Sequence, residues 1–164
     1  MKLSIRLTFF FIFLGSFAQS ERPAQGFDKT TFYSILKEGR LPDINEELNI
    51  LNIVFIKEKD AYEGTLLMRK AGIINIPGEK LKLFKDGRIK LENSILKDNL
   101  NPEYRFLRLT IEEHAPKILD YGEDLDKDKQ YITLFFKNLS PAVKQAIVDY
   151  AKTSKILNPA DFNN

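Results

Sequence analysis

The sequence predicts an all-α fold of five to seven helices in short-loop helical hairpins. Apolar residues recur three and four positions apart through most of the chain, which is the period of a helix with one buried face. No long segment alternates with period two, and no Asn-Gly or Asp-Gly turn joins strand-like runs. Prolines and glycines mostly punctuate the helical segments. Together these observations favour packed helical hairpins over a sheet.

The first residues predict export. Lys2 and Arg6 precede the apolar run 7–17, which is too short to span a bilayer, and small residues follow it. This order is typical of a signal peptide at residues 1–18, with cleavage after Ala18 or after Ser20. We therefore expect an exported protein, periplasmic or secreted, with no membrane span after signal cleavage. Its oligomeric state is left open.

Charge and cysteine content exclude several classes of function. Residues 1–18 hold two of the 25 Lys and Arg residues and none of the 23 Asp and Glu residues, so the exported chain would be neutral. A neutral chain without a basic stripe gives no sign of nucleic-acid binding. The chain has no cysteine, which excludes disulfides, thiolate metal sites and cysteine nucleophiles.

A leader, 19–26, precedes the first two helices of a single predicted domain, 27–157. Asp28 is a typical helix cap, and Gly39 supplies a left-handed stop for the first helix. Asp43 and Glu46 have the spacing of a capping box, which predicts the start of the second helix. The expected apolar stripe of this second helix is Ile44, Leu48, Leu51 and Phe55.

The next three helices enclose two interior glycines and a proline corner. The third is expected at 59–71, closed by Gly72, and the fourth at 79–97, with Leu81 on its apolar face. A glycine inside a helix costs roughly 1 kcal/mol relative to alanine. Gly64 is therefore easiest to explain if another helix comes close. Asn101 can cap the fifth helix, whose first position suits Pro102.

The last third of the chain is expected to begin with a polar surface loop, 121–129. Two further helices follow, one over 132–139 and one that Ser140 caps and Pro141 begins. Residues 158–164 are expected to form a tail.

Part of this pattern resembles a known repeat. The stretches AYEGTLLMRKAG and SILKDNLNPEY, within 59–109, resemble a tetratricopeptide-type helical hairpin and the start of the next one. The positions that carry the resemblance are Ala61, Tyr62, Gly64, Ser94, Asn101 and Pro102. The chain has no tryptophan, and its inter-helix linker, 72–78, is longer than usual for this repeat. AYEG, KAG and EYRFLRL also resemble small exported bacterial helical proteins of unknown function. The fold alternatives are a tetratricopeptide-like arrangement and an irregular bundle.

No catalytic or metal motif is found. His114 is the only histidine, and no Gly-x-Ser-x-Gly or His-Glu-x-x-His pattern is present. The acidic stretch GEDLDKDK, at 122–129, lacks both the central glycine and the terminal glutamate of a calcium loop. We therefore expect no enzyme activity, no metal and no cofactor.

The expected function is non-catalytic binding of an envelope protein or a peptide on the third to fifth helices. Arg105 and Arg108 lie three apart, as a two-arginine clamp for a carboxylate or phosphate would. The alternative for these arginines is ordinary surface ion pairing, including Arg108 with Glu112. Tyr62 and Arg69 complete the set of candidate residues. The alternative function is a small-ligand or lipid carrier with a cavity between helices.

Overall fold

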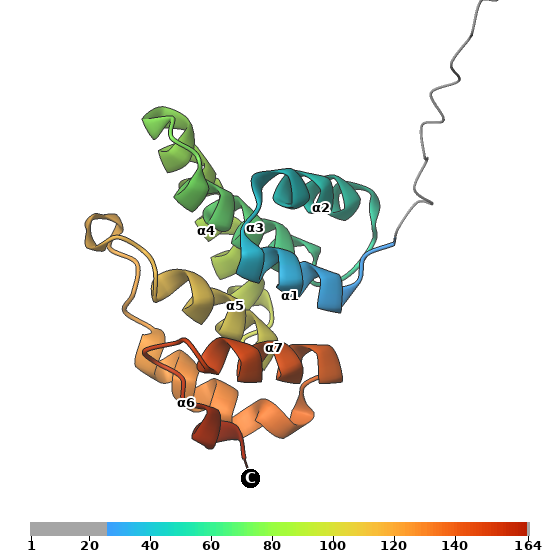
Figure 1. Cartoon of the computed structure of the whole chain (residues 1–164), viewed down its shortest axis with the longest axis vertical. Helices are drawn as coiled ribbons and strands as arrows, with labels where there is room; N and C mark the ends of the chain where they lie inside the picture. The colour runs from blue at the N-terminus through green and yellow to red at the C-terminus, as the bar shows by residue number, and fades with distance from the viewer. Residues whose placement is uncertain (1–25, 164) are drawn as a thin grey trace, which may run out of the picture.

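The fold is all-helical, as the sequence predicts. The computed structural model describes residues 26–163, and this part of the chain contains seven α-helices, three short 3-10 helices and no strand (Figure 1). The predicted signal peptide and residues 19–25 of the leader lie outside the described residues. None of the described helices is long and apolar enough to cross a membrane.

The helices follow one another with short connections. The α-helices are α1 (Lys29–Glu38), α2 (Leu41–Ile53), α3 (Lys59–Ile73), α4 (Pro77–Lys97), α5 (Pro102–Glu112), α6 (Leu125–Phe135) and α7 (Pro141–Ala151). The 3-10 helices are η1 (Lys117–Leu119), η2 (Phe136–Asn138) and η3 (Pro159–Phe162).

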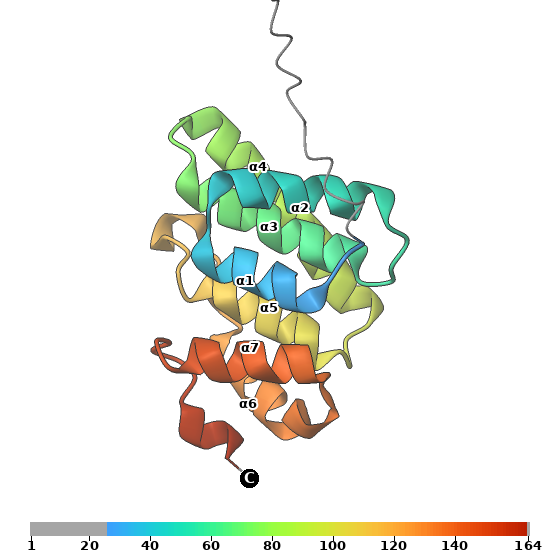
Figure 2. The ribbon, with the colours of Figure 1, turned by 45° about the vertical axis from the view of Figure 1, so that its right-hand side comes forward.

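Helix α5 lies at the centre of the arrangement. It packs against α3 and α4 on one side and against α6 on the other, while α1 packs against α7 (Figures 1 and 2). Aromatic side chains fill the core between α1, α3 and α5. The ring of Tyr62 lies 4.6 Å from that of Phe32 and 4.8 Å from that of Phe27, measured between centroids. The first helix is therefore held to α3 by contacts between aromatic rings.

Two glycines bring α3 and α4 into backbone contact. A Cβ atom added to Gly64 would lie 2.6 Å from the carbonyl oxygen of Gly87, and one added to Gly87 would lie 2.5 Å from that of Gly64. No side chain fits at such distances. The close approach predicted for Gly64 is confirmed.

Several helix ends follow the predicted capping chemistry. The carboxylate of Asp28 accepts a hydrogen bond from the Thr31 amide at 2.7 Å, and Gly39 adopts the left-handed conformation with φ 68°. The Asn101 side chain accepts from the Glu103 amide at 3.0 Å. Pro102 occupies the first turn of α5.

Other boundaries differ from the predictions. Helix α2 begins at Leu41, so Asp43 lies in its first turn and pairs with Arg40 at 2.6 Å instead of forming a capping box. Pro42 explains the earlier start, because its fixed φ suits a first turn. The helix ends at Ile53, which leaves Phe55 fully exposed and outside the predicted stripe.

Three smaller expectations were also wrong. Gly72 lies within α3 and does not stop it, because the helix continues to Ile73. Leu81 is 45% exposed, since this part of α4 extends beyond its neighbours. The Ser140 side chain makes no capping hydrogen bond, although Pro141 does begin α7.

The predicted loop, 121–129, and the predicted tail, 158–164, both contain helical structure that was not expected. Helix α6 begins at Leu125, within the expected loop, and Asp128 is fully buried. A buried ion pair with Arg108 explains how this polar turn enters the interior. At the other end, Pro159–Phe162 form a 3-10 helix, and Phe162 is buried with its ring 4.7 Å from that of Phe136.

Candidate functional site

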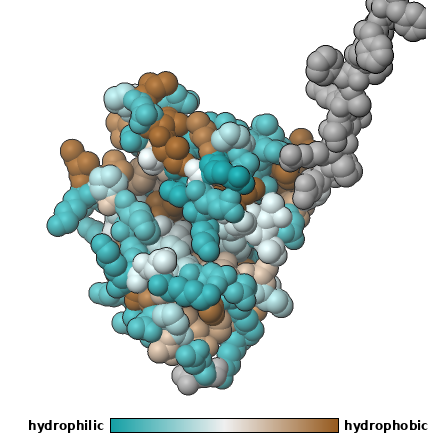
Figure 3. Space-filling view, viewed as in Figure 1, coloured by the Kyte–Doolittle hydropathy of each residue, from teal (hydrophilic) through white to brown (hydrophobic). Residues whose placement is uncertain are grey.

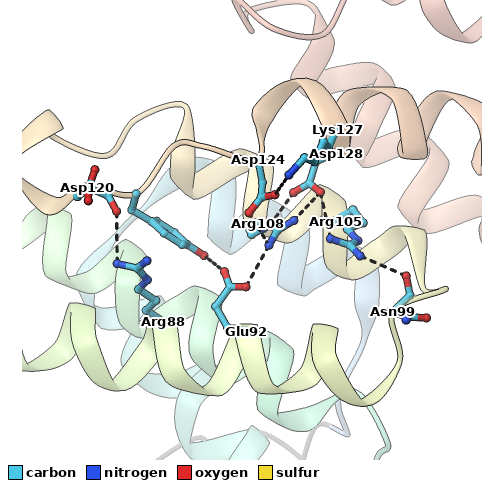
Figure 4. A network of polar contacts seen from close by, with 10 residues as sticks. Arg88, Glu92, Asn99, Arg105, Arg108, Asp120, Asp124, Lys127 and Asp128 are labelled. Atoms are coloured by element: carbon cyan, nitrogen blue, oxygen red, sulfur yellow. Dashed lines mark hydrogen bonds and ion pairs between the residues drawn. The ribbon is translucent and has the colours of Figure 1, made fainter.

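The predicted arginine clamp exists, but the chain itself fills it. Arg108 donates from Nε to Oδ2 of Asp128 at 2.7 Å and from Nη2 to Oδ1 at 2.7 Å (Figure 4). Its Nη1 lies 3.0 Å from a carboxylate oxygen of Glu92 and 3.0 Å from one of Asp124. The guanidinium is buried, and all three of its nitrogens contact carboxylates that belong to α4, to α6 or to the residue before α6. Arg108 therefore joins α5 to its neighbours.

Arg105 belongs to the same network. Its Nη1 lies 3.5 Å from Oδ1 of Asp128, and its Nη2 donates to the Asn99 carbonyl oxygen at 3.4 Å (Figure 4). The guanidinium also lies 5.6 Å from the centroid of the Tyr131 ring. Arg105 and Arg108 thus share one carboxylate, as the clamp hypothesis required. That carboxylate is internal.

Tyr62 is fully buried and is part of a second polar cluster. Its hydroxyl donates to Oε1 of Glu103 at 2.6 Å, and the Tyr33 hydroxyl donates to the same oxygen at 2.9 Å. Lys29 reaches the other oxygen of Glu103 at 2.8 Å. Burial, reinforced by the nearby Glu103 carboxylate, raises the pKa of Tyr62 well above its ordinary value. These contacts fix α1, α3 and α5 to one another.

Arg69 connects α3 to the turn between α1 and α2. Its Nε donates to the Leu36 carbonyl oxygen at 3.0 Å. The guanidinium lies against Gly39, where an added Cβ would come within 2.7 Å of the Arg69 Cζ. The structure therefore brings together Arg105 and Arg108, and places Tyr62 and Arg69 in separate internal contacts.

The single histidine lies near the end of α5, outside any cluster of metal-binding side chains among residues 26–163. His114 is exposed, and its Nδ1 lies 3.2 Å from the Thr110 carbonyl oxygen. Residues 26–163 contain no group of three or more histidine, aspartate or glutamate side chains that could hold a metal ion.

An acidic groove runs between α1 and α2, beside the turn that Arg69 contacts. Its volume is about 380 Å³. Along its walls the ionisable side chains are Asp28, Glu38, Asp43, Glu46, Glu47 and Arg40. Arg40 pairs with Glu38 at 3.1 Å and with Asp43 at 2.6 Å. The groove is therefore strongly negative, and the cation among these lining residues is already bound at one end.

Glu47 gives this groove its chemical character. Its side chain is only 2% exposed, and its Oε1 has no hydrogen-bond partner among the described residues. Burial raises the pKa of Glu47, and the nearby carboxylates of Asp28 and Glu46 raise it further. A buried carboxylate without a donor is costly and uncommon in folded proteins.

The position of Glu47 in the sequence already indicates that its side chain is buried, although the pattern of apolar residues alone did not single it out. Glu47 lies three residues after Ile44 and four before Leu51, both fully buried. It therefore occupies a core-facing position of α2. A glutamate at such a position requires either a donor from elsewhere or a ligand.

A second buried carboxylate without a partner lies beside the arginine network. Glu112 is 4% exposed, its Oε2 has no hydrogen-bond partner among the described residues, and it lines a cavity of about 140 Å³. Burial raises its pKa to about 7, against the opposing charge of Arg108. The carboxylates of Asp128, Asp124 and Glu92 add to the rise. The salt bridge expected between Arg108 and Glu112 is replaced by the pair with Asp128.

Comparisons of this chain with known protein families, with curated proteins and with solved structures found no match.

Proposed function

We propose that this protein is a non-catalytic binding module that takes a cationic segment of a peptide or protein in the groove between α1 and α2. The observation that carries the proposal is Glu47, a buried carboxylate with an unused oxygen in the wall of an acidic groove. Three side chains donate to the buried carboxylate of Glu103, whereas the described part of the chain supplies no donor to this oxygen of Glu47.

A lysine ammonium or an arginine guanidinium is the chemistry that fits this site. Either group would donate to the carboxylate of Glu47, which lines the groove, and would be attracted by Asp28 and Glu46. Binding would also lower the pKa of Glu47, because a nearby positive charge favours the ionised carboxylate. The peptide-binding role expected from the sequence is retained, with its site moved from α3–α5 to α1–α2.

The signal-like N-terminus supports export as part of this proposal. The partner would then be an envelope or secreted protein, or a peptide in the periplasm or outside the cell. The resemblance of 59–109 to tetratricopeptide hairpins also supports a binding role, since that repeat presents helical surfaces to partners.

The second candidate function is a carrier of a small organic cation. The groove volume of about 380 Å³ lies within the usual range for small-ligand sites. Its charged walls favour a polyamine over a lipid, because an apolar chain would leave these carboxylates without donors.

The test is a titration of the protein with a lysine-alanine repeat peptide, a glutamate-alanine repeat peptide and spermidine, measured by calorimetry. We expect binding of the lysine peptide only, weakened about thirtyfold or more by Glu47→Gln, because one charge of a buried pair is removed. Glu79→Gln, on the exposed first turn of α4, is the matched control and should change nothing. Binding of spermidine alone would favour the carrier. Equal binding to wild type and Glu47→Gln would remove the groove as the site.

A further inference from the structure

The outer side of α4 carries exposed aliphatic residues that no described helix covers. Leu81 is 45% exposed, Ile89 59% and Leu96 77%. At about 100° per residue, these three side chains fall within an arc of roughly 80°. The buried residues of α4, such as Phe84 and Leu91, lie to one side of that arc. They face α3 and α5, the main packing partners of α4.

Basic side chains share this arc. Lys85 lies between Leu81 and Ile89 on the helix surface, and Lys82 lies at the edge of the arc. Both lysines are exposed, and among residues 26–163 the ion pair of Lys82 is a long one, 3.9 Å, with Asp86. We call Leu81, Lys82, Lys85, Ile89 and Leu96 the outer face of α4.

The acidic residue within this arc, Glu92, is already bound. It accepts from the Tyr121 hydroxyl at 2.7 Å and pairs with Arg108 at 3.0 Å (Figure 4). Its carboxylate is thus directed toward α5 and the loop that follows it. The outer face of α4 therefore presents aliphatic groups and positive charge together.

The apolar character continues at the start of α4. Ile76, which precedes Pro77, is 61% exposed. Figure 3 shows apolar side chains gathered at the projecting end of the α3–α4 hairpin. Since α3 and α4 extend beyond the rest of the molecule there, a flat surface could approach this end without meeting other helices (Figure 1).

We propose that the outer face of α4 docks the protein on an anionic lipid surface. A helix face with aliphatic and basic side chains lies in the plane of a membrane interface, with its apolar groups at the acyl boundary and its lysines at the headgroups. Each lysine near an anionic membrane surface strengthens binding by about the same amount of electrostatic free energy. Lys82 and Lys85 would contact anionic headgroups, while Leu81, Ile89 and Leu96 would enter the interface.

A second copy of the chain fits this face less well. In a symmetric pair the same patch meets itself, so Lys82 and Lys85 of one copy would face a patch that also carries two lysines. Like charges opposed across an interface are unfavourable. Glu92 does not neutralise these lysines, because its carboxylate is already bound by Arg108 and Tyr121.

This mode of docking leaves the acidic groove accessible. Helices α2 and α4 lie on opposite sides of α3 (Figures 1 and 2). With α4 on the lipid surface, the groove between α1 and α2 would face away from it. The two binding surfaces are also opposite in charge, so an anionic membrane would orient the molecule in this way.

The experiment is co-sedimentation of the protein, from residue 19 onward, with phosphatidylcholine vesicles and with vesicles that also contain phosphatidylglycerol. We expect binding only to the anionic vesicles, decreasing as salt is raised. The Lys82→Gln, Lys85→Gln double variant should bind roughly thirtyfold more weakly. Ile89→Ser should also weaken binding.

Matched controls come from helices that lie elsewhere. Leu134, on α6, is 74% exposed, and Lys137 is exposed in η2, so Leu134→Ser and Lys137→Gln should bind as wild type does. Equal weakening by these controls would overturn the proposal, as would absence of binding or equal binding to neutral vesicles. A dimer in sedimentation velocity that Ile89→Ser dissociates, without vesicle binding, would assign the face to self-association. Binding to an acidic protein in place of vesicles would assign it to a protein partner.

Discussion

Two regions of the molecule differ in how their buried carboxylates are paired. One is the junction of α4, α5 and α6, and the other is the groove between α1 and α2. In the junction, Asp128 is buried and receives two hydrogen bonds of 2.7 Å from Arg108. In the groove, Glu47 is buried to a similar degree and its Oε1 receives none from the described residues. The first arrangement holds helices together, whereas the second leaves the acceptor that the proposed cationic partner would use.

Glu103 shows that this difference does not come from burial. It is 5% exposed and accepts hydrogen bonds from Tyr33, Tyr62 and Lys29. A buried carboxylate in this protein can thus be fully supplied with donors. The informative feature of Glu47 is therefore the missing partner, and the same reasoning applies to Glu112.

The largest effect is expected from breaking the junction. Arg108→Met would leave Asp128 buried without its cation, and we expect a loss of about 3–5 kcal/mol in the free energy of unfolding. Urea denaturation measures this loss. The double variant Arg108→Met, Asp128→Leu should recover most of it, because neither charge then remains buried. A loss below about 1 kcal/mol in the single variant would show that the pair is not structural.

A somewhat smaller loss is expected at Glu103. Glu103→Ala removes the acceptor of two buried tyrosine hydroxyls, and an unsatisfied buried donor costs about 1–3 kcal/mol. We expect a total of about 2–3 kcal/mol, measured by urea denaturation. Tyr33→Phe removes one donor and leaves the other contacts, so it should cost less than Glu103→Ala does. A larger loss of stability in Tyr33→Phe than in Glu103→Ala would mean that the Glu103 carboxylate does not accept from both tyrosines.

Substitution of Glu112 is expected to stabilise the protein instead of destabilising it, and the size of this effect depends on pH. Its folded pKa, about 7, lies above the ordinary value for an unfolded glutamate, about 4.3. The folded state therefore favours the protonated form, and wild type loses stability as pH rises from about 4.3 to 7. Glu112→Gln should be as stable as wild type near pH 4 and more stable near pH 8, by on the order of 2 kcal/mol. Urea denaturation at the two pH values measures this difference, and a difference independent of pH would contradict the assignment.

The smallest effect on stability is expected at Glu47, whose pKa is shifted less than that of Glu112. Burial raises the pKa of Glu47, so Glu47→Gln should increase stability at pH 8 by about 1 kcal/mol while it removes cation binding. The thermal unfolding temperature and the peptide titration measure the two changes. Destabilisation by this substitution would place Glu47 with Asp128 and Glu103 as a structural carboxylate.

The sequence predicted features that depend on neighbouring residues. The caps at Asp28 and Asn101 and the left-handed Gly39 follow from local backbone chemistry, and the structure has all three. The close approach at Gly64 was also predictable, because an interior glycine is otherwise unfavourable. These signals were sufficient for the all-α fold.

Features that depend on a distant partner were not predictable in this way. The first turn of α6 was expected to be part of a surface loop, because nothing near Asp128 in the sequence indicates Arg108, which lies on another helix. For the same reason the two arginines looked free to bind a ligand. The unused oxygen of Glu47 is harder still to predict from the sequence, because it is recognised only by the absence of hydrogen-bond donors from every neighbouring described helix.

The contact between α1 and α7 has a consequence for how the chain folds. The α3–α4 pair joins segments that are adjacent in sequence, whereas α1 and α7 come from opposite ends of the described chain. Tyr33 on α1, Phe106 on α5 and Tyr150 on α7 form a continuous row of rings, with centroids 5.8 and 5.7 Å apart. Contacts distant in sequence close late, because the intervening chain must first be ordered. The contact of α1 with α7 therefore forms only after α7 is synthesised, whereas the walls of the groove, α1 and α2, are adjacent in sequence and can meet earlier.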